Sequence, residues 1–508
     1  MNPRPLRPVL LFWAVAHASP LLLADVTLAP LFTDHAVLQR DRPVPVWGRA
    51  DPGEAITLTF AGQTARTVAD DQGKWSVTLD ALPASATGRA LTVTGKNTVT
   101  LSDLLVGDVW LCGGQSNMEW PLANTDGASA EIAAATYPEI RHIKIERAIS
   151  AWPVETARGV WTVCSPETAA HYTAVGYYFA RDIHREIGVP IGLVNSNWGG
   201  TPVEAWLPAA AARDPRVDLL AASHQLAAAQ SIKDNLQRHV DQLAAWRSAR
   251  DAAHAAGRPF ESPRPAAPWT PGPSNTSYGL NHAMIAPLAP AALRGVIWYQ
   301  GEANADQPET YHELFSALIR GWREQFAAPD LPFYWVQLAN WNAGNPQGTG
   351  WARLREAQTQ TLALPHTGQA VIYDIGDVED IHPRNKRDVG ARLARIALAD
   401  TYGRDVVASG PTLDRVSFDG ATATVSFEHA HGLRTTDSAA PLAFELAGRD
   451  GVFHPAAASL NADAGTVTLR ADAVPTPTQV RYAWRNTTPV NLVNAAGLPA
   501  APFRTDSQ

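Results

Sequence analysis

The sequence predicts an α/β protein: a central parallel sheet covered by helices, with a β-rich domain at each end of the chain. Three observations support this prediction. Between 104 and 403, short apolar runs alternate with helical stretches, as buried parallel strands and their connections do. Before and after that stretch, short strand-like runs are separated by turn residues. The chain has 508 residues, more than the ~250–300 that one core usually holds.

Residues 1–24 have the composition of an export signal. Arg4 and Arg7 give a positive start, and Val9 to Ala16 form a short apolar run before small residues. That run is too short to span a bilayer, and no later stretch of about 18 apolar residues follows. We therefore expect no membrane span and an exported protein, periplasmic or secreted.

The two terminal regions, 25–103 and 404–508, each predict a small β-sandwich-like domain. Runs of β-branched and aromatic residues alternate in both with turns such as Asp51-Pro52-Gly53. The clearest predicted strands are Val44–Trp47, Ile56–Phe60, Trp75–Leu79 and Leu91–Val93, then Thr422–Phe427, Thr466–Leu469 and Val480–Trp484.

The central region, 104–403, predicts the parallel sheet. Its helices are expected at Tyr177–Ile187 and Tyr311–Phe326. Residues 208–275 differ, being rich in Ala, Gln and Arg and then in Pro, and predict a mostly helical insertion beside the site or a surface spacer. The predicted strands are Val106–Cys112, Ile191–Asn195, Gly295–Tyr299, Phe333–Leu338 and Ala370–Ile375.

Composition excludes some functions. The net charge of -8, without a run of basic residues, argues against a nucleic-acid partner. Two cysteines, Cys112 and Cys164, cannot form a four-cysteine metal site, and spacing alone leaves open whether they pair. No metal or organic cofactor is expected. Trp (17) outnumbers Phe (13) and Tyr (11); indole rings stack on sugar rings, so the excess hints at a carbohydrate partner, while packing in the core is the alternative role.

Four segments with chemically active residues each follow a predicted strand, where open α/β sheets bind ligands. Ser116 follows two glycines after the first strand, on a turn that could expose its hydroxyl. Gly199 and Gly200 follow the second strand and could leave backbone N–H groups facing an oxyanion.

The other two segments supply polar and titratable groups. Gln300 follows a buried strand, and its amide could donate to a developing negative charge. His382 follows Glu379 and Asp380, and a carboxylate near a histidine can orient the imidazole and stabilise its protonated form. Each pattern alone could also be an ordinary turn or a solvated loop.

In this order, the segments resemble the SGNH hydrolases and, within them, the sialate O-acetylesterase-like carbohydrate esterases. The resemblance covers most of the chain and implies a flavodoxin-like three-layer α/β/α catalytic domain. The matching stretches are Leu31–Asp34, Val37–Arg40, Pro43–Gly48, the Ser116 block, Trp198–Trp206, Trp298–Asn304, His382–Lys386, Arg481–Asn486, Gly497–Pro499 and Pro502–Asp506.

The resemblance also implies roles. Ser116 would be the nucleophile and His382 the general base and acid, with Asp380 as the acid that orients it. The oxyanion hole would combine the N–H groups of Ser116 and of Gly199 or Gly200 with the amide of Gln300. Neighbouring residues are candidates for contacting the substrate: Gln115, Asn117, Trp198, Glu302 and Asn304.

Two departures from the SGNH pattern matter. The position three residues before the histidine holds Glu379 instead of Asp, so Glu379 is an alternative acid and a Ser–His dyad stays open. The third block offers Gln300-Gly301-Glu302 in place of the usual Gly-x-Asn-Asp, which weakens the assignment of the amide donor.

The predicted reaction is hydrolysis of acetyl esters of sugar hydroxyls, with no cofactor. Relatives imply an acetylated plant hemicellulose oligosaccharide, xyloglucan or xylan, or an O-acetylated sialic acid. Two alternatives stay open: a glycoside hydrolase using Glu302 and Asp380, and a non-catalytic carbohydrate-binding protein. The oligomeric state is not predicted.

Overall fold

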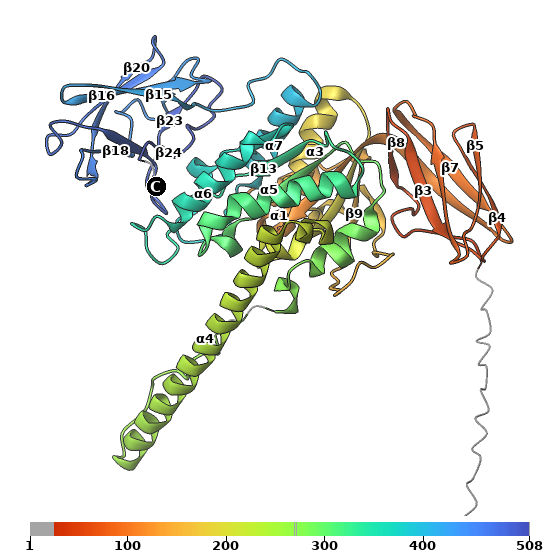
Figure 1. Cartoon of the computed structure of the whole chain (residues 1–508), viewed down its shortest axis with the longest axis horizontal. Helices are drawn as coiled ribbons and strands as arrows, with labels where there is room; N and C mark the ends of the chain where they lie inside the picture. Colours follow the sequence, from red (N-terminus) through yellow and green to blue (C-terminus); the bar gives the residue numbers. More distant parts are fainter. Residues whose placement is uncertain (1–24, 269, 271, 507–508) are drawn as a thin grey trace, which may run out of the picture.

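The computed structural model describes residues 25–506 apart from 269 and 271, so the predicted export signal lies outside it. Within the described residues, no helix is both long and apolar enough to cross a membrane. Figure 1 shows a mixed α/β centre with the N-terminal strands at one end and the C-terminal strands at the other. One helix, α4 (Pro215–Ala255), projects away from the centre.

The central sheet has the strand order β10-β9-β11-β8-β12-β13-β14, and only β10 pairs antiparallel in this series. Without the edge strands β9 and β10, the order along the chain is second, first, third, fourth, fifth. This is a flavodoxin-like order, in which ligands bind at the carboxyl ends of the strands where the order reverses. The strands are β8 Thr98–Gly114, β9 Tyr137–Lys144, β10 Trp161–Cys164, β11 Ile191–Asn197, β12 Gly295–Tyr299, β13 Phe333–Val336 and β14 Thr367–Ala370.

Helices cover both faces of this sheet, as adjacent residues of β13 show. Tyr334 hydrogen-bonds Thr401, the residue that ends α7, at 2.7 Å. Trp335, the next residue, packs edge-on against Phe315 of α5 at 5.2 Å between ring centroids. Successive side chains of a strand point to opposite faces, so α7 and α5 lie on opposite sides. The helices other than α4 are α1 Ser116–Glu119, α2 Ala128–Ala133, α3 Ala174–Ile187, α5 Pro308–Gln325, α6 Gly350–Gln360 and α7 Lys386–Asp400.

The N-terminal region is continuous with the central sheet, because β8 runs through both. Its first half pairs with β7 and β2, and its second half pairs with β11 and β12. The boundary predicted at 103/104 therefore falls inside one strand. The other N-terminal strands are β1 Thr27–Leu28, β2 Val37–Gln39, β3 Val44–Arg49, β4 Ala55–Phe60, β5 Gln63–Val68, β6 Lys74–Leu79 and β7 Ser85–Thr94.

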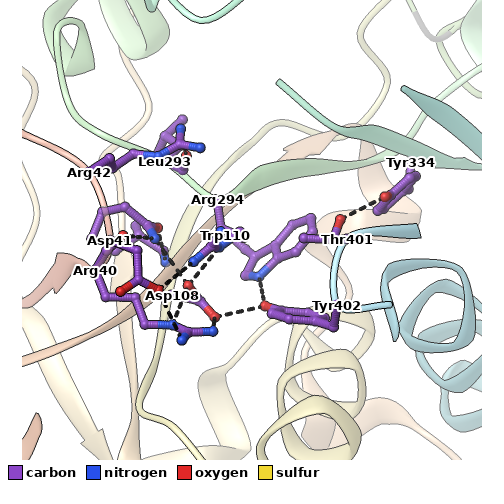
Figure 2. A network of polar contacts seen from close by, with 12 residues as sticks. Arg40, Asp41, Arg42, Asp108, Trp110, Leu293, Arg294, Tyr334, Thr401 and Tyr402 are labelled. Carbon is purple, nitrogen blue, oxygen red and sulfur yellow. Dashed lines mark hydrogen bonds and ion pairs between the residues drawn. The ribbon is translucent and has the colours of Figure 1, made fainter. Parts of the chain in front are cut away.

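A buried carboxylate joins these parts at the start of the parallel portion of β8 (Figure 2). Asp108 is fully buried and accepts bonds from Arg40 at 3.0 Å and from Arg294 at 2.7 Å. Gln39 and Tyr402 donate to the same carboxylate, each at 3.0 Å. Residues from the N-terminal region, the turn before β12 and the end of α7 thus meet at one charge.

The C-terminal region contains two four-stranded antiparallel sheets and a short two-stranded one, around one apolar cluster. Tyr373 of the central region also belongs to that cluster. The strands are β15 Thr412–Asp419, β16 Thr422–Glu428, β21 Thr466–Arg470 and β20 Ala457–Asn461, then β19 His454–Pro455, β18 Phe444–Ala447, β22 Gln479–Tyr482 and β24 Phe503–Arg504, and finally β17 Arg434–Thr435 with β23 Leu492–Val493.

Helix α4 forms most of the range 208–275. The Asp214 side chain accepts from Arg216 N at 3.0 Å, and Pro215 occupies the first turn, where a missing N–H costs nothing. At 1.5 Å per residue, its 41 residues make a rod about 60 Å long. Only three of its residues are buried, Val217, Ala221 and Ala253.

Two predictions about the sheet were wrong. The strand expected at Ala370–Ile375 is instead β14, which ends at Ala370, and a 3-10 turn over Tyr373–Ile375 follows. Val371 and Tyr373 pack against the apolar cluster of the C-terminal region, whereas Ile372 and Ile375 pack against the main apolar cluster. Strands β9 and β10 were not expected. Arg141 and His142 make β9 look polar, although both are buried, Arg141 in an ion pair and His142 on Tyr172.

Candidate active site

The ends of three neighbouring strands are aligned at the carboxyl edge of the sheet. Gly114 of β8 pairs with Asn197 of β11 on one side and with Tyr299 of β12 on the other. The segments that begin with Gln115, Trp198 and Gln300 therefore leave the sheet side by side. Gly114 has a φ of +131°, and a Cβ there would lie 2.2 Å from the Tyr299 carbonyl oxygen, so only glycine fits before the turn.

This turn brings Ser116 to His382. Ser116 begins the one-turn helix α1, and its Oγ lies 2.9 Å from His382 Nε2. The imidazole stacks on Trp120, with ring centroids 5.0 Å apart and planes 17° apart. Trp120 ends α1, so the same turn that presents the hydroxyl also supports the histidine ring.

Neither predicted acid forms a hydrogen bond to the other imidazole nitrogen. Asp380 Oδ1 lies 3.6 Å from His382 Nδ1, beyond hydrogen-bond length, and accepts the His382 backbone N–H at 2.9 Å. Glu379 is exposed and accepts from Asn342 at 3.2 Å, so it points elsewhere. Asp380 is therefore the carboxylate nearer to the histidine, in an ion-pair position.

Two of the predicted oxyanion donors are already used. Gly199 N–H donates to Glu119 Oε2 at 2.9 Å. Both amide hydrogens of Gln300 are also donated, to Thr201 O at 3.2 Å and to Asn304 Oδ1 at 2.7 Å. The contacts contradict the expectation that these two groups are free donors.

The other two predicted donors, the N–H groups of Ser116 and Gly200, have no hydrogen-bond partner within the described part of the chain. Gly200 follows Gly199, which touches the serine: a Cβ on Gly199 would be 3.1 Å from Ser116 Cβ. A φ of +73° at Gly200 turns the backbone there in a conformation that favours glycine.

A buried network ties the segment of Ser116 to the segment of His382. Asn117 donates to the carbonyl of Ile381 at 3.0 Å and to Glu302 Oε1 at 2.6 Å. The Lys386 ammonium, fully buried, donates to Asn117 Oδ1 at 2.5 Å and to the carbonyl of Pro383 at 2.7 Å. The residue after the serine thus bonds to groups on both sides of the histidine.

Burial sets the electrostatics of this network. It lowers the pKa of Lys386 to about 7, against the opposite pull of the Glu302 and Asp380 charges. It raises the pKa of Glu302, whose Oε2 is buried without a partner. The pKa of His382 is lowered by burial and by the Lys386 charge, while Asp380 opposes both.

The residues predicted to contact substrate divide into two groups. Gln115 is buried and accepts from the backbone of Ala303, and the buried Asn304 amide donates to Glu204. Asn117 and Glu302 belong to the buried network. Trp198 is only partly buried and carries the Arg147 guanidinium 5.2 Å above its ring. The first four support the site from within.

Sequence reasoning missed Lys386, Trp120 and Glu119. Glu119 holds Lys144 at 3.0 Å and Arg147 at 2.7 Å, so it anchors cations beside the site. Spacing was the available signal, because Lys386 lies four residues after His382 and Trp120 four after Ser116. Among the described residues, no group of three or more His, Cys, Asp or Glu side chains could hold a metal, and Cys112 and Cys164 are buried and unpaired.

A serine hydroxyl in contact with a histidine, at the carboxyl edge of a parallel sheet, is the arrangement of serine-dependent hydrolases. Comparisons with known proteins identify the chain as an esterase. The family model described as carbohydrate esterase, sialic acid-specific acetylesterase, matches residues 266–399. Rat sialate O-acetylesterase is 30% identical over 452 residues, covering 81% of this chain and 80% of the relative.

Two further relatives extend the match. Human sialate O-acetylesterase is 29% identical over 427 residues, covering 76% of this chain and 73% of the relative. The crystal structure of a carbohydrate acetylesterase from Xanthomonas citri is 40% identical, with a TM-score of 0.81, and covers 95% of this chain and 100% of that one. The chain belongs to the sialate O-acetylesterase family and is an esterase.

Proposed function

We propose that this esterase removes acetyl groups from sugar hydroxyls through an acetyl-enzyme on Ser116, with His382 as general base and acid. The observation that supports the mechanism is the 2.9 Å contact between Ser116 Oγ and His382 Nε2. Nε2 must then accept the serine proton, so the neutral imidazole carries its hydrogen on Nδ1, facing Asp380.

In the first step, Ser116 Oγ attacks the acetyl carbonyl while its proton moves to His382 Nε2. The negative charge on the carbonyl oxygen is held by the free N–H groups of Ser116 and Gly200, each contributing about 10²–10³ in rate. His382 then protonates the departing sugar oxygen. A water molecule, deprotonated by the same imidazole, releases acetate and restores the serine.

Asp380 acts on this cycle through charge. At 3.6 Å its carboxylate stabilises the imidazolium without forming a hydrogen bond to it. Asp380 also accepts the backbone N–H of His382, which fixes the start of the loop. This proposal therefore gives Asp380 a smaller role than the acid of a closed triad has.

The catalytic region, 104–403, is of the SGNH type with three layers, and the terminal regions are β-sandwich-like domains. The chain is exported by its first 24 residues. The substrate is an acetylated hemicellulose oligosaccharide or an O-acetylated sialic acid, in keeping with relatives described as carbohydrate and sialate acetylesterases.

The two alternatives find no support in the contacts. A glycoside hydrolase needs Glu302 and Asp380 to face one sugar, yet Glu302 bonds to Asn117 and Asp380 to the backbone of His382. A non-catalytic binding protein would not require the hydrogen bond between Ser116 and His382.

The test is acetate release by wild type and by Ser116→Ala from acetylated xyloglucan oligosaccharides, acetylated xylan, O-acetyl sialic acid and nitrophenyl acetate. We expect Ser116→Ala to lose about 10⁴-fold or more in kcat, since no other group can form the acyl-enzyme. Ser248→Ala, on the exposed part of α4, is the matched control and keeps full activity. Acetate release by Ser116→Ala at the wild-type rate contradicts the mechanism.

A further inference from the structure

A cavity of about 740 Å³ opens beside the Ser116–His382 pair, between α4 and the loop after β12. Gly200 and Glu302 are among its lining residues. Gly200 follows the glycine that touches Ser116, and Glu302 bonds to the residue after Ser116. The cavity is therefore lined by direct neighbours of the catalytic segment, and its volume is that of a ligand pocket.

The outer wall of the cavity is one face of α4. Most of its lining residues are spaced three or four apart, as on one helix face. They are Ala221, His224, Gln225, Ala227, Ala228, Ala229, Ser231, Ile232 and Asn235. The opposite wall comes from residues 302–307, and the segment 272–277 closes one side. Helix α4 thus serves as a wall of the cavity at its base, and the rest projects beyond it (Figure 1).

The base of this wall is held rigidly. His224 of α4 bonds through one ring nitrogen to Glu204 and through the other, at 2.9 Å, to Thr310 Oγ1. Tyr278 donates to Asp218 of α4 at 2.8 Å. Glu204 in turn is held by the Asn304 amide at 3.0 Å. A wall fixed before binding loses little conformational freedom when a ligand enters.

Several polar side chains that line the cavity are available to hydrogen-bond a ligand. The side chains of Gln225, Ser231, Asp306 and Gln307 make no hydrogen bond within the described part of the chain. Amides, hydroxyls and carboxylates offer both donors and acceptors, as sugar hydroxyls require. Ile232 and the alanines of α4 give apolar surface between them.

The charge of the lining selects among sugars. Glu204, Glu302 and Asp306 line the cavity, and no lysine or arginine does. The histidine of the lining, His224, is already bonded to Glu204, so a carboxylate on the ligand would find no free cationic partner among the lining residues. The lining therefore suits a neutral sugar chain and disfavours sialic or uronic acid residues.

We propose that this cavity binds the sugar residues next to the acetylated one, so that the substrate is a neutral oligosaccharide or polysaccharide longer than a single sugar. The inference rests on the proposed function, because it takes Ser116 as the point of cleavage. It adds to that function a second binding region, built by α4, that measures the length and charge of the glycan.

The experiment measures binding apart from catalysis. The full-length Ser116→Ala protein is titrated calorimetrically with cello-, xylo- and xyloglucan oligosaccharides of increasing length, without acetyl groups, and with sialyllactose. We expect affinity to rise with the length of the neutral chains and sialyllactose to bind more weakly than a neutral trisaccharide. Equal affinity for a monosaccharide and an oligosaccharide, or preferred binding of sialyllactose, overturns the proposal.

A bulky residue in the wall locates the binding. Ala228→Trp in the same background fills the cavity and should weaken oligosaccharide binding about tenfold or more, or ~1.4 kcal/mol. Ala222→Trp, an exposed position of α4 outside the cavity, is the matched control and should leave binding unchanged. Unchanged binding by Ala228→Trp places the glycan elsewhere and overturns the proposal.

Active proteins then separate the two hypotheses. In the active protein, which keeps Ser116, Ala228→Trp should lower kcat/KM for an acetylated oligosaccharide about tenfold more than for nitrophenyl acetate. Serine-independent acetate release defeats the proposed function and leaves the binding result standing. Serine-dependent release with equal losses on both substrates defeats the cavity proposal and leaves the function standing.

Discussion

The two ends of the parallel half of β8 bury charge in opposite ways. At one end, Asp108 accepts four donors and two of them are guanidinium groups (Figure 2). Burial alone would raise the pKa of Asp108, but the Arg40 and Arg294 charges hold it below its usual value. At the other end, Glu302 accepts a side-chain hydrogen bond from Asn117, and its second carboxylate oxygen is buried without a partner among the described residues.

Lys386 does not form a direct ion pair with the Glu302 carboxylate, unlike the arginines at Asp108. Lys386 donates to an amide oxygen and a carbonyl, with Asn117 between it and the carboxylate. Burial therefore disfavours the charged form of both groups: it lowers the pKa of Lys386 and raises the pKa of Glu302. Removing a partner from a fully paired buried charge destabilises the fold strongly. Incompletely paired buried charges cost stability and are found at functional sites, where the rest of the structure compensates for that cost.

The largest expected effect is on stability, at the Asp108 end. Asp108→Asn removes the fully buried carboxylate that the partly buried Arg40 and Arg294 share and leaves them only the exposed Asp41, which should lower the free energy of unfolding by about 3–5 kcal/mol. Denaturant unfolding followed by circular dichroism measures the loss. The folded fraction should keep the wild-type kcat, because no atom of this cluster reaches the Ser116 end.

Asp41→Asn is the matched control for that variant. Asp41 pairs with the same Arg40 and Arg294, but its side chain is 52% exposed. Its loss should therefore lower the free energy of unfolding by less than about 1 kcal/mol. Equal effects of the two substitutions would mean that burial does not distinguish the two carboxylates.

The next effect is on catalysis, at the Lys386 end. Lys386→Met keeps the length of the side chain but removes its bonds to Asn117 and to the carbonyl after His382. A loosened His382 should lower kcat about 10- to 100-fold with little change in KM, as small misplacements of reacting groups do. Because the lysine is only partly paired, the free energy of unfolding should change less than in Asp108→Asn.

The neighbouring Arg387→Met provides the control, since Arg387 is exposed and lies 3.8 Å from Glu131. It should leave both kcat and stability at wild-type values. A Lys386→Met protein with wild-type kcat, or one destabilised as strongly as Asp108→Asn, would show that the two ends of β8 do not differ as argued.

Strand patterns in the sequence were enough to place the site. The runs that became β8, β11 and β12 were recognised from their apolar residues, and their carboxyl ends lie in register. Ser116 was therefore expected at the carboxyl edge of the sheet. His382 was expected there because it follows the run Ala370–Ile375, although only Ala370 of that run lies in a strand. The structure brings the two residues into contact. The resemblance to a family supplied their roles.

Contacts between side chains could not be predicted in the same way. A polar residue after a strand, such as Gln300, has the same sequence pattern whether its amide is free or bonded to Thr201 and Asn304. Lys386 near a helix start is typical of a surface cation, yet it is buried. Both facts depend on residues far apart in the chain, which one sequence does not connect.

A smaller effect is expected at the acid. Asp380→Asn should lower kcat less than about tenfold, because the carboxylate lies 3.6 Å from His382 Nδ1 and acts through charge alone. In a closed triad, the same substitution costs about 10⁴. Glu379→Gln is the control and should have no effect, since Glu379 bonds to Asn342. A loss near 10⁴ for Asp380→Asn would mean that the acid moves into contact during the reaction.

The finest test is the acid limb of the pH profile of kcat/KM. His382 acts as a base only when it is neutral, and burial and the Lys386 charge lower its pKa below the usual 6.5. Activity should therefore persist below pH 6.5 and fall as the pH drops through the lowered pKa.

Lys386 has a pKa of about 7 and is mostly charged in that range, so Lys386→Met should raise the pKa of His382 and move the acid limb to higher pH. Asp380→Asn, which removes the opposing charge, should move it to lower pH. Since Asp108 lies at the other end of β8, Asp108→Asn should leave the limb in place. If the acid limb moved in Asp108→Asn but not in Lys386→Met, the Lys386 charge would not be what lowers the pKa of His382.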